Sequence, residues 1–229
     1  MTLVIGHRGA SHDFSENTLD AFEGAKAQGA DWVELDVRRT SDGLLIVHHD
    51  AHLSDGRAIA DVKAGELPKS VPTLEAALHA CAPMGVNVEI KNAESEPGFD
   101  ATGRLARETV SVIHATISGT ANVLVSSFDL ATLDVVREAD GEMLTGYLVL
   151  SGEEPADAVA LCVERNHQAI NPYDFFVSAE SIARAHDSGI EVNVWTVDDP
   201  ARIAELGSWG VDSVITNRPA LALAALGRA

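Results

Sequence analysis

Short apolar runs rich in β-branched residues alternate with longer segments rich in Ala, Leu and Glu along most of the chain. The short runs are typical of strands and the longer segments of helices. We expect strands at Leu3–Ile5, Trp32–Val37, Leu44–Val47, Val86–Ile90, Asn122–Val125, Leu144–Leu148, Gln168–Ile170, Glu191–Val194 and Ser213–Ile215. We expect helices at Leu19–Gln28, Leu74–Cys81, Thr102–Ile117, Leu130–Ala139, Ala156–Arg165, Ala179–Asp187, Pro200–Leu206 and Ala220–Leu226. This alternation predicts parallel β/α units.

The connection between the second and third expected strands decides the architecture. Only Thr40–Gly43 separates them, which is too short for a crossover between parallel strands. We therefore expect Val37–Val47 to be an antiparallel hairpin at the end of the second strand, followed by a small insert or lid at Ala51–Val71. The remaining strands and helices predict an α/β fold, a (β/α)₈ TIM barrel forming a single domain over residues 1–229. An open doubly wound sheet is the alternative.

The charge of the chain limits its partners. There are 16 Lys and Arg residues against 35 Asp and Glu residues, so the formal net charge is −19. No basic cluster is present, so we expect no nucleic-acid binding and no stable association with anionic membranes, and a small molecule as the partner. Nothing in the pattern decides the oligomeric state.

Cysteine usage and the absence of targeting patterns favour a reducing compartment. Cys81 and Cys162 lie in Ala- and Leu-rich helical patterns, where a buried, unreactive thiol is expected. No apolar run approaches the ~18–20 residues of a membrane span, and no signal-peptide pattern opens the chain. We therefore expect a cytoplasmic protein.

Charged and polar residues gather where the expected strands end. Barrel enzymes build their active sites at the carboxyl ends of the strands. The residues in question are His7-Arg8-Gly9, Glu34-Leu35-Asp36, His48-His49-Asp50, Asn87-Val88-Glu89-Ile90-Lys91, Asn193-Val194-Trp195-Thr196 and Thr216-Asn217-Arg218-Pro219. The pattern therefore predicts a site at this end of a barrel.

Strand periodicity directs three carboxylates into that site. Glu34 and Asp36 share one face of their strand, and Glu89 occupies the matching face of the next barrel strand. Carboxylates held this close repel each other unless a cation lies among them, and oxygen ligands suit Mg²⁺ or Ca²⁺. We therefore expect one divalent cation at Glu34, Asp36 and Glu89. The alternative is a solvated strand edge whose carboxylates pair with Arg38 or Arg39.

Two histidines approach the same cluster by independent routes. His7 follows the first strand, and His49 returns to the cluster through the hairpin. Histidine carries protons near neutral pH, so both are candidates for general acid–base catalysis. His48 competes with His49, since neighbouring strand residues face opposite sides. The other histidines are expected to be structural or on the surface: His12, His52, His79, His114, His167 and His186.

Fixed positive charge and an aromatic side chain complete the candidate site. Arg8 and Lys91 are suited to holding an anionic phosphate, although each could instead pair with a neighbouring carboxylate. Trp195 is either a wall that packs against the organic part of a substrate or a plug in the barrel core. Ser127 is assigned no chemical role.

Taken together, these motifs resemble one family over nearly the whole chain. They are His7-Arg8-Gly9, Glu16-Asn17-Thr18, Glu34-x-Asp36, Asp42-Gly43, His49-Asp50, Glu89-x-Lys91, Ser127-Phe128, Trp195-Thr196-Val197 and Thr216-x-Arg218-Pro219. The sequence resembles the glycerophosphodiester phosphodiesterase family. The resemblance implies hydrolysis of glycerophosphodiesters to sn-glycerol 3-phosphate and an alcohol. It also implies a metal at Glu34, Asp36 and Glu89, His7 and His49 as general acid and base, and phosphate contacts from Arg8 and Lys91.

Two departures from the family pattern bear on specificity. Ser15 stands where the family usually has proline, and the segment after His49-Asp50 is shorter than the family's glycerol-recognising insert. A shorter insert leaves room for a phosphodiesterase with another head group, such as a lysophospholipase D or a sphingomyelinase D-like enzyme. A catalytically silent barrel that binds an anion or a metal is the alternative from a different functional class.

Overall fold

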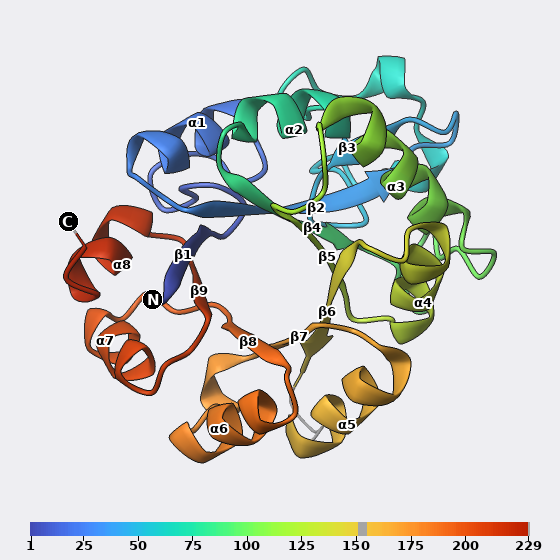
Figure 1. Ribbon diagram of the computed structural model, residues 1–229. Coiled ribbons are helices and arrows are strands. Elements are labelled where there is room, and N and C mark those ends of the chain that lie inside the picture. Colours follow the sequence, from blue (N-terminus) through green and yellow to red (C-terminus); the bar gives the residue numbers. More distant parts are fainter. Residues whose placement is uncertain (151–154, 229) are drawn as a thin grey trace.

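Parallel strands form a closed ring surrounded by helices in the computed structural model, which describes residues 1–150 and 155–228 (Figure 1). The ring consists of β1 (Leu3–Gly6), β2 (Trp32–Arg39), β4 (Gly85–Ile90), β5 (Val123–Ser127), β6 (Leu144–Val149), β7 (Ala169–Pro172), β8 (Glu191–Val194) and β9 (Ser213–Thr216). Each of these strands pairs in parallel with its neighbours, and β1 pairs with both β9 and β2. The (β/α)₈ barrel is therefore confirmed, and the open doubly wound sheet is excluded.

The hairpin after the second barrel strand is also confirmed. Strand β3 (Leu45–Val47) lies outside the ring and pairs antiparallel with β2, with Val37 opposite Val47. Gly43 closes the turn with a φ of 93°, a conformation that glycine adopts without steric cost. The segment that follows contains two short 3₁₀ helices, η1 (Ile59–Asp61) and η2 (Ala64–Glu66).

In the described part of the chain, eight α-helices cover the outside of the ring. They are α1 (Leu19–Ala27), α2 (Leu74–Cys81), α3 (Arg104–Thr116), α4 (Leu130–Ala139), α5 (Pro155–Arg165), α6 (Ala179–Asp187), α7 (Pro200–Ser208) and α8 (Pro219–Ala225), and a third 3₁₀ helix, η3, spans Asp174–Phe176. Side-chain oxygens of Thr18, Thr73, Asp129, Ser178 and Asp199 accept backbone N–H groups at helix starts, which explains why the helices begin there. No helix among the described residues is long and apolar enough to cross a bilayer.

The main core lies between the strands and the helices, and it leaves the inner face of the strands available for chemistry. On β2, Val33 and Leu35 are fully buried in this core, and Glu34 and Asp36 alternate with them. Cys81 and Cys162 also pack into this layer, and burial raises the pKa of each thiol to about 12. The expectation that both cysteines are buried is therefore confirmed.

An ion pair fastens the start of the barrel to the segment that follows its last helix. Asp31 receives two 2.7 Å hydrogen bonds from Arg228 and one of 2.8 Å from the backbone N–H of Val4. Burial raises the pKa of Asp31, but the hydrogen bonds from Arg228 and Val4 outweigh it, so the pKa is lowered overall.

We expect Asp31→Asn to lower the free energy of unfolding by about 1 kcal/mol at neutral pH, since the pair is partly exposed to solvent. A carboxyl whose pKa is lowered by folding stabilises the protein above its unfolded pKa of about 3.9, and this stabilisation is lost as the pH falls through the folded value. Urea unfolding of both proteins at pH values of about 7 and 3 measures the effect. An equal difference at both pH values would show that the charge is irrelevant.

Candidate active site

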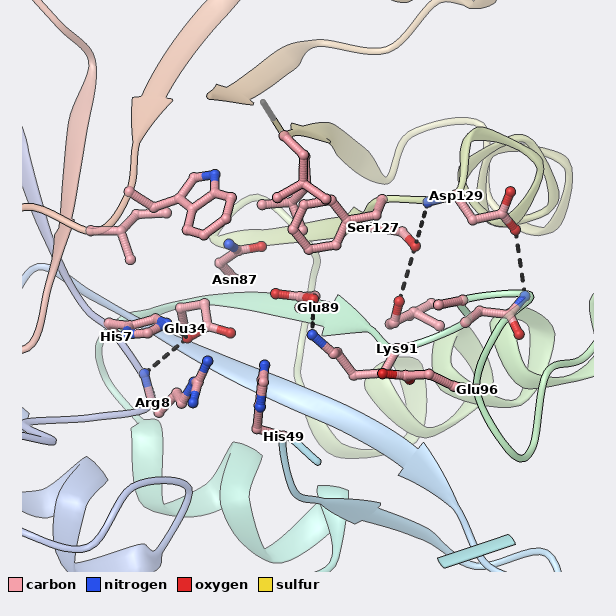
Figure 2. Close-up of a pocket in the computed structure, with 18 of the residues that line it drawn as sticks. His7, Arg8, Glu34, His49, Asn87, Glu89, Lys91, Glu96, Ser127 and Asp129 are labelled. Carbon is pink, nitrogen blue, oxygen red and sulfur yellow. Dashed lines mark hydrogen bonds and ion pairs between the residues drawn. The ribbon is translucent and has the colours of Figure 1, made fainter. Parts of the chain in front are cut away.

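A cavity of about 580 Å³ opens among residues that lie at or just after the carboxyl ends of the strands (Figure 2). His7 and Arg8 follow β1, Lys91 follows β4, and Trp195 follows β8. Polar residues cover one part of its lining, and aromatic and aliphatic residues cover another. No residue of the insert at Ala51–Val71 is among the described residues that line the cavity.

Three buried carboxylates form one cluster beside the cavity: Glu34 and Glu89 line it, whereas Asp36 belongs to the cluster but is not among the described lining residues. Asp36 of β2 lies opposite Glu89 of β4 in the strand register, and Glu34 lies opposite Asn87. Glu34, Asp36 and Glu89 each offer an oxygen within 4.8 Å of the others. Glu34 Oε1 and Asp36 Oδ1 are buried and have no hydrogen-bond partner among the described residues. Three convergent carboxylates, two of which keep a buried oxygen without a hydrogen-bond partner, fit a hard divalent cation.

The three carboxyl groups of this cluster differ in how readily they ionise. Burial, together with the charges of Asp36 and Glu89, raises the pKa of Glu34 well above its ordinary value. Burial also raises the pKa of Glu89, although Lys91 opposes it. Burial raises the pKa of Asp36 as well, but Lys91 and Arg8 outweigh this effect and the pKa is lowered overall. A bound cation would favour the ionised form of all three carboxyl groups.

Arg8 and Lys91 line the cavity and also pair with its carboxylates. The Nζ atom of Lys91 lies 2.7 Å from Glu89 Oε1 and 3.6 Å from Asp36 Oδ1. The Nε atom of Arg8 lies 3.3 Å from Asp36 Oδ2, and its Nη1 lies 2.9 Å from Glu16 Oε2. Burial lowers the pKa of Lys91, but Glu89 and Asp36 outweigh it, so the ammonium stays charged. The expected pairing with neighbouring carboxylates is therefore observed for both cations, and both also line the cavity.

The backbone around Arg8 is adapted to this position. Arg8 and Gly9 both adopt positive φ values, 55° and 89°, and a Cβ on Gly9 would lie 2.6 Å from the backbone of Ala21. This close turn directs the N–H of Arg8 to Glu34 Oε2 at 2.9 Å. The turn therefore positions Arg8, whose backbone N–H binds Glu34 while its guanidinium pairs with Asp36.

Both candidate histidines line the cavity, but their partners differ. His7 Nδ1 lies 2.8 Å from Asn217 Oδ1, and its Nε2 lies 4.0 Å from Glu34 Oε2. Burial and the charge of Arg8 lower the pKa of His7. His49 Nδ1 lies 2.8 Å from Asp50 Oδ1.

The histidines other than His7 and His49 are not among the described residues that line the cavity. His48 is not among the lining residues, and its Nδ1 lies 2.9 Å from the backbone oxygen of Asp50. Of the two neighbours, His49 therefore faces the cavity. None of the six histidines expected to be structural is among the described lining residues.

Trp195 forms part of the cavity wall. Its ring packs edge-on against Phe128 at 5.7 Å and against Tyr173 at 5.4 Å between centroids. Its indole N–H donates to the backbone oxygen of Asn171 at 2.7 Å, which fixes the ring. Trp195 therefore lies in the cavity wall and is not a plug in the barrel core.

Comparison with known proteins identifies the family. The model of the glycerophosphoryl diester phosphodiesterase family matches residues 7–221. The chain belongs to this family. The enzyme is 29% identical over 238 residues to a glycerophosphodiester phosphodiesterase from Caldanaerobacter subterraneus subsp. tengcongensis, with 95% of each chain covered.

Solved structures share the fold of the enzyme. A glycerophosphodiester phosphodiesterase from Thermotoga maritima has 27% identity and a TM-score of 0.82, with 98% of each chain covered. A phosphodiesterase from Oleispira antarctica, solved in complex with the product sn-glycerol-3-phosphate, has 25% identity and a TM-score of 0.86, with 99% of this chain and 97% of that chain covered. These relatives define the enzyme as a phosphoric diester hydrolase, not a catalytically silent barrel.

Some contacts in the site were not anticipated from the sequence. Asn17 is buried with a φ of 56°, and its side-chain amide donates to Asp36 Oδ2 at 2.8 Å. The sequence signal for it is only its place in Glu16-Asn17-Thr18, one of the motifs that carry the family resemblance. Arg38 and Arg39 pair with Glu96 and Glu108. They therefore do not neutralise the carboxylates of β2, and the strand-edge alternative is wrong.

Proposed function

We propose that the enzyme hydrolyses glycerophosphodiesters to sn-glycerol 3-phosphate and an alcohol, using one divalent cation and a pair of histidines. The observation that carries the proposal is a cluster of three buried carboxylates within 4.8 Å of one another, two of which, Glu34 and Glu89, line the same cavity as His7 and His49. Family membership supports the substrate class, and the Oleispira antarctica relative binds sn-glycerol-3-phosphate.

Glu34, Asp36 and Glu89 would hold the cation, either Mg²⁺ or Ca²⁺. The unpartnered oxygens of Glu34 and Asp36 and the hard oxygen donors of all three carboxylates support this assignment. A cation bound there supplies positive charge that stabilises the negative charge developing on the phosphoryl oxygens.

His7 and His49 would move the protons. Attack by water and attack by a neighbouring hydroxyl of the substrate both need one group that accepts a proton from the attacking oxygen. Both also need a second group that protonates the leaving alkoxide. His7 follows β1 and His49 follows β3, the outer strand of the hairpin, and both line the cavity. This arrangement supports their use as a pair.

Arg8, Lys91 and Trp195 would bind the substrate. Arg8 and Lys91 bring positive charge to the cavity, and together with a bound cation they would reverse the negative sign of the carboxylates where a phosphate enters. The fixed indole of Trp195 would pack against the carbon atoms of the substrate.

Product analysis tests this proposal. We expect glycerophosphocholine and glycerophosphoethanolamine to release sn-glycerol 3-phosphate, measured with an assay specific for that product. Release of phosphocholine and glycerol would mean that the other phosphate ester bond is broken. Absence of any hydrolysis in the presence of Mg²⁺ or Ca²⁺ would refute the proposal.

A second candidate, hydrolysis of lysophospholipids, is favoured by the apolar part of the cavity. Phe99, Phe128, Leu148 and Leu150 line it, and Phe99 and Leu150 are also exposed to solvent, at 40% and 53%. An acyl chain could leave the cavity along these two side chains.

If an acyl chain binds along Phe99 and Leu150, replacing either with alanine should lower activity on a lysophospholipid but not on a glycerophosphodiester. We expect Phe99→Ala and Leu150→Ala to lower kcat/KM for lysophosphatidylcholine by about tenfold, the effect of removing a few buried methylene contacts, and to spare glycerophosphocholine. Steady-state assays of the three proteins on both substrates measure this. A wild-type preference for lysophosphatidylcholine would replace the first proposal with the second.

A further inference from the structure

A chain of hydrogen bonds reaches His7 from outside the cavity. Asp198 follows β8, Asn217 follows β9 and His7 follows β1, and these three strands are neighbours in the ring (Figure 1). Asn217 Nδ2 donates to Asp198 Oδ2 at 2.7 Å, and Asn217 Oδ1 lies 2.8 Å from His7 Nδ1. The Asp198–Asn217–His7 chain therefore links three strand ends.

The carboxylate determines the direction of every bond in this chain. A carboxylate only accepts hydrogen bonds, so the group of Asn217 that faces Asp198 must be its NH₂. The carbonyl oxygen of Asn217 then faces His7, and an oxygen can only accept. His7 Nδ1 must therefore carry a proton, which leaves Nε2 as the unprotonated nitrogen of the neutral ring.

The orientation of Asp198 is itself fixed. Its Oδ1 accepts from the hydroxyl of Thr216 at 2.8 Å and from the backbone N–H of Asn217 at 2.9 Å. The hydroxyl of Ser11 lies 2.8 Å from Asn217 Oδ1 and 2.7 Å from the backbone oxygen of His7, and its single proton can serve only one of them, so Ser11 does not decide the orientation. The fixed carboxylate of Asp198 therefore sets the orientation of the Asn217 amide.

We propose that Asp198 and Asn217 are positioning residues that hold His7 in the Nδ1–H tautomer, so that His7 is the member of the histidine pair that accepts a proton, at Nε2. The proposal rests on the proposed function, because it assumes that His7 takes part in the reaction. Neither Asp198 nor Asn217 is among the described residues that line the cavity, so both act through His7. The alternative is that the chain only ties the loops after β8 and β9 together.

Nitrogen NMR of the imidazole separates these two roles without substrate. In wild-type protein labelled with ¹⁵N-histidine, at a pH where His7 is neutral, we expect Nδ1 of His7 to be protonated and Nε2 to be unprotonated. The His7→Gln variant identifies the resonances. Asn217→Ala should move the ring towards the Nε2–H tautomer. A wild-type ring with its proton on Nε2, or an Asn217→Ala ring unchanged from wild type, would overturn the proposal.

An exchange of the two side chains provides the kinetic test. We expect Asn217→Ala to lower kcat at least about tenfold, up to the ~10²–10⁴-fold contribution of a general base, with KM nearly unchanged. Asn217→Asp places two carboxylates against each other and should also be impaired. The double variant Asp198→Asn with Asn217→Asp keeps an acceptor at His7 and a donor between the two residues. It should recover kcat to within about threefold of wild type.

A matched variant controls for the loss of an Asp–His contact elsewhere. Asp212 accepts from the ring of His186 at 2.8 Å and precedes β9, so it lies at the opposite end of the strand from Asn217. Asp212→Asn should leave kcat unchanged. A double variant as impaired as Asn217→Ala would overturn the proposal. Loss of hydrolysis by the wild type would refute the proposed function alone, since the NMR result does not depend on turnover.

Discussion

Replacing His49 with alanine is expected to lower kcat by about 10²–10⁴-fold, the usual contribution of a general acid or base, while the protein stays folded. The side chain of His49 is 33% exposed, and its described contact is with the still more exposed Asp50. Its removal therefore creates no buried cavity, and the loss of rate reports chemistry. His7→Ala is expected to have an effect of the same size, because the reaction needs both an acid and a base.

His48 provides the matched control for this experiment. It is the neighbouring histidine, it also contacts Asp50, and it does not line the cavity. His48→Ala should retain kcat and KM within about twofold of wild type. Steady-state kinetics with glycerophosphocholine measure all three variants, and circular dichroism checks their folding. Equal losses in His48→Ala and His49→Ala would remove His49 from the mechanism.

Substitution of Glu34 by glutamine is expected to abolish cation binding and yet to stabilise the cation-free protein. The pKa of Glu34 is raised well above its ordinary value by burial and by Asp36 and Glu89. A carboxyl whose pKa is raised by folding destabilises the protein as the pH rises above its unfolded value of about 4.3. Glutamine removes this charge and keeps an oxygen that can accept the N–H of Arg8.

Thermal unfolding with and without Mg²⁺ or Ca²⁺ measures both effects. A cation present at 100 times its Kd stabilises the wild type by about 2.7 kcal/mol, and no such shift is expected for Glu34→Gln. Without cation, Glu34→Gln should have the higher Tm at neutral pH, and the difference should shrink towards pH values of about 4.

The control for this experiment is Glu108→Gln. Glu108 is a helix glutamate that pairs with Arg39 and Arg104 outside the cavity. Its substitution should leave the cation-dependent shift intact. A normal shift in Glu34→Gln, or a lower Tm for its cation-free form, would contradict the cation site.

The barrel and the carboxylate cluster could be predicted because both depend on short-range rules. Alternation along β2 and β4 gives Glu34, Asp36 and Glu89 a common face whatever the loops do. The brevity of Thr40–Gly43 excludes a parallel crossover and thereby fixes the strand count. These features follow from neighbours in the sequence.

The partners of the cavity residues could not be predicted, because loop conformations decide them. Asn17 reaches Asp36 through a left-handed backbone conformation that no periodicity signals. Asn217 meets His7 across 210 positions of sequence. Because neighbouring side chains of a strand face opposite sides, the sequence predicts that only one of His48 and His49 faces the cavity. The path of the chain after β3 decides that it is His49.

The most direct test of the account is the hydrolysis of glycerophosphocholine by the wild-type enzyme after treatment with a chelator. We expect release of sn-glycerol 3-phosphate to fall to background and to return when Mg²⁺ or Ca²⁺ is added in excess. The Glu34→Gln variant should show no such recovery, because Glu34 is one of the three convergent carboxylates. Turnover that persists at the wild-type rate in chelator would contradict a cation-dependent site.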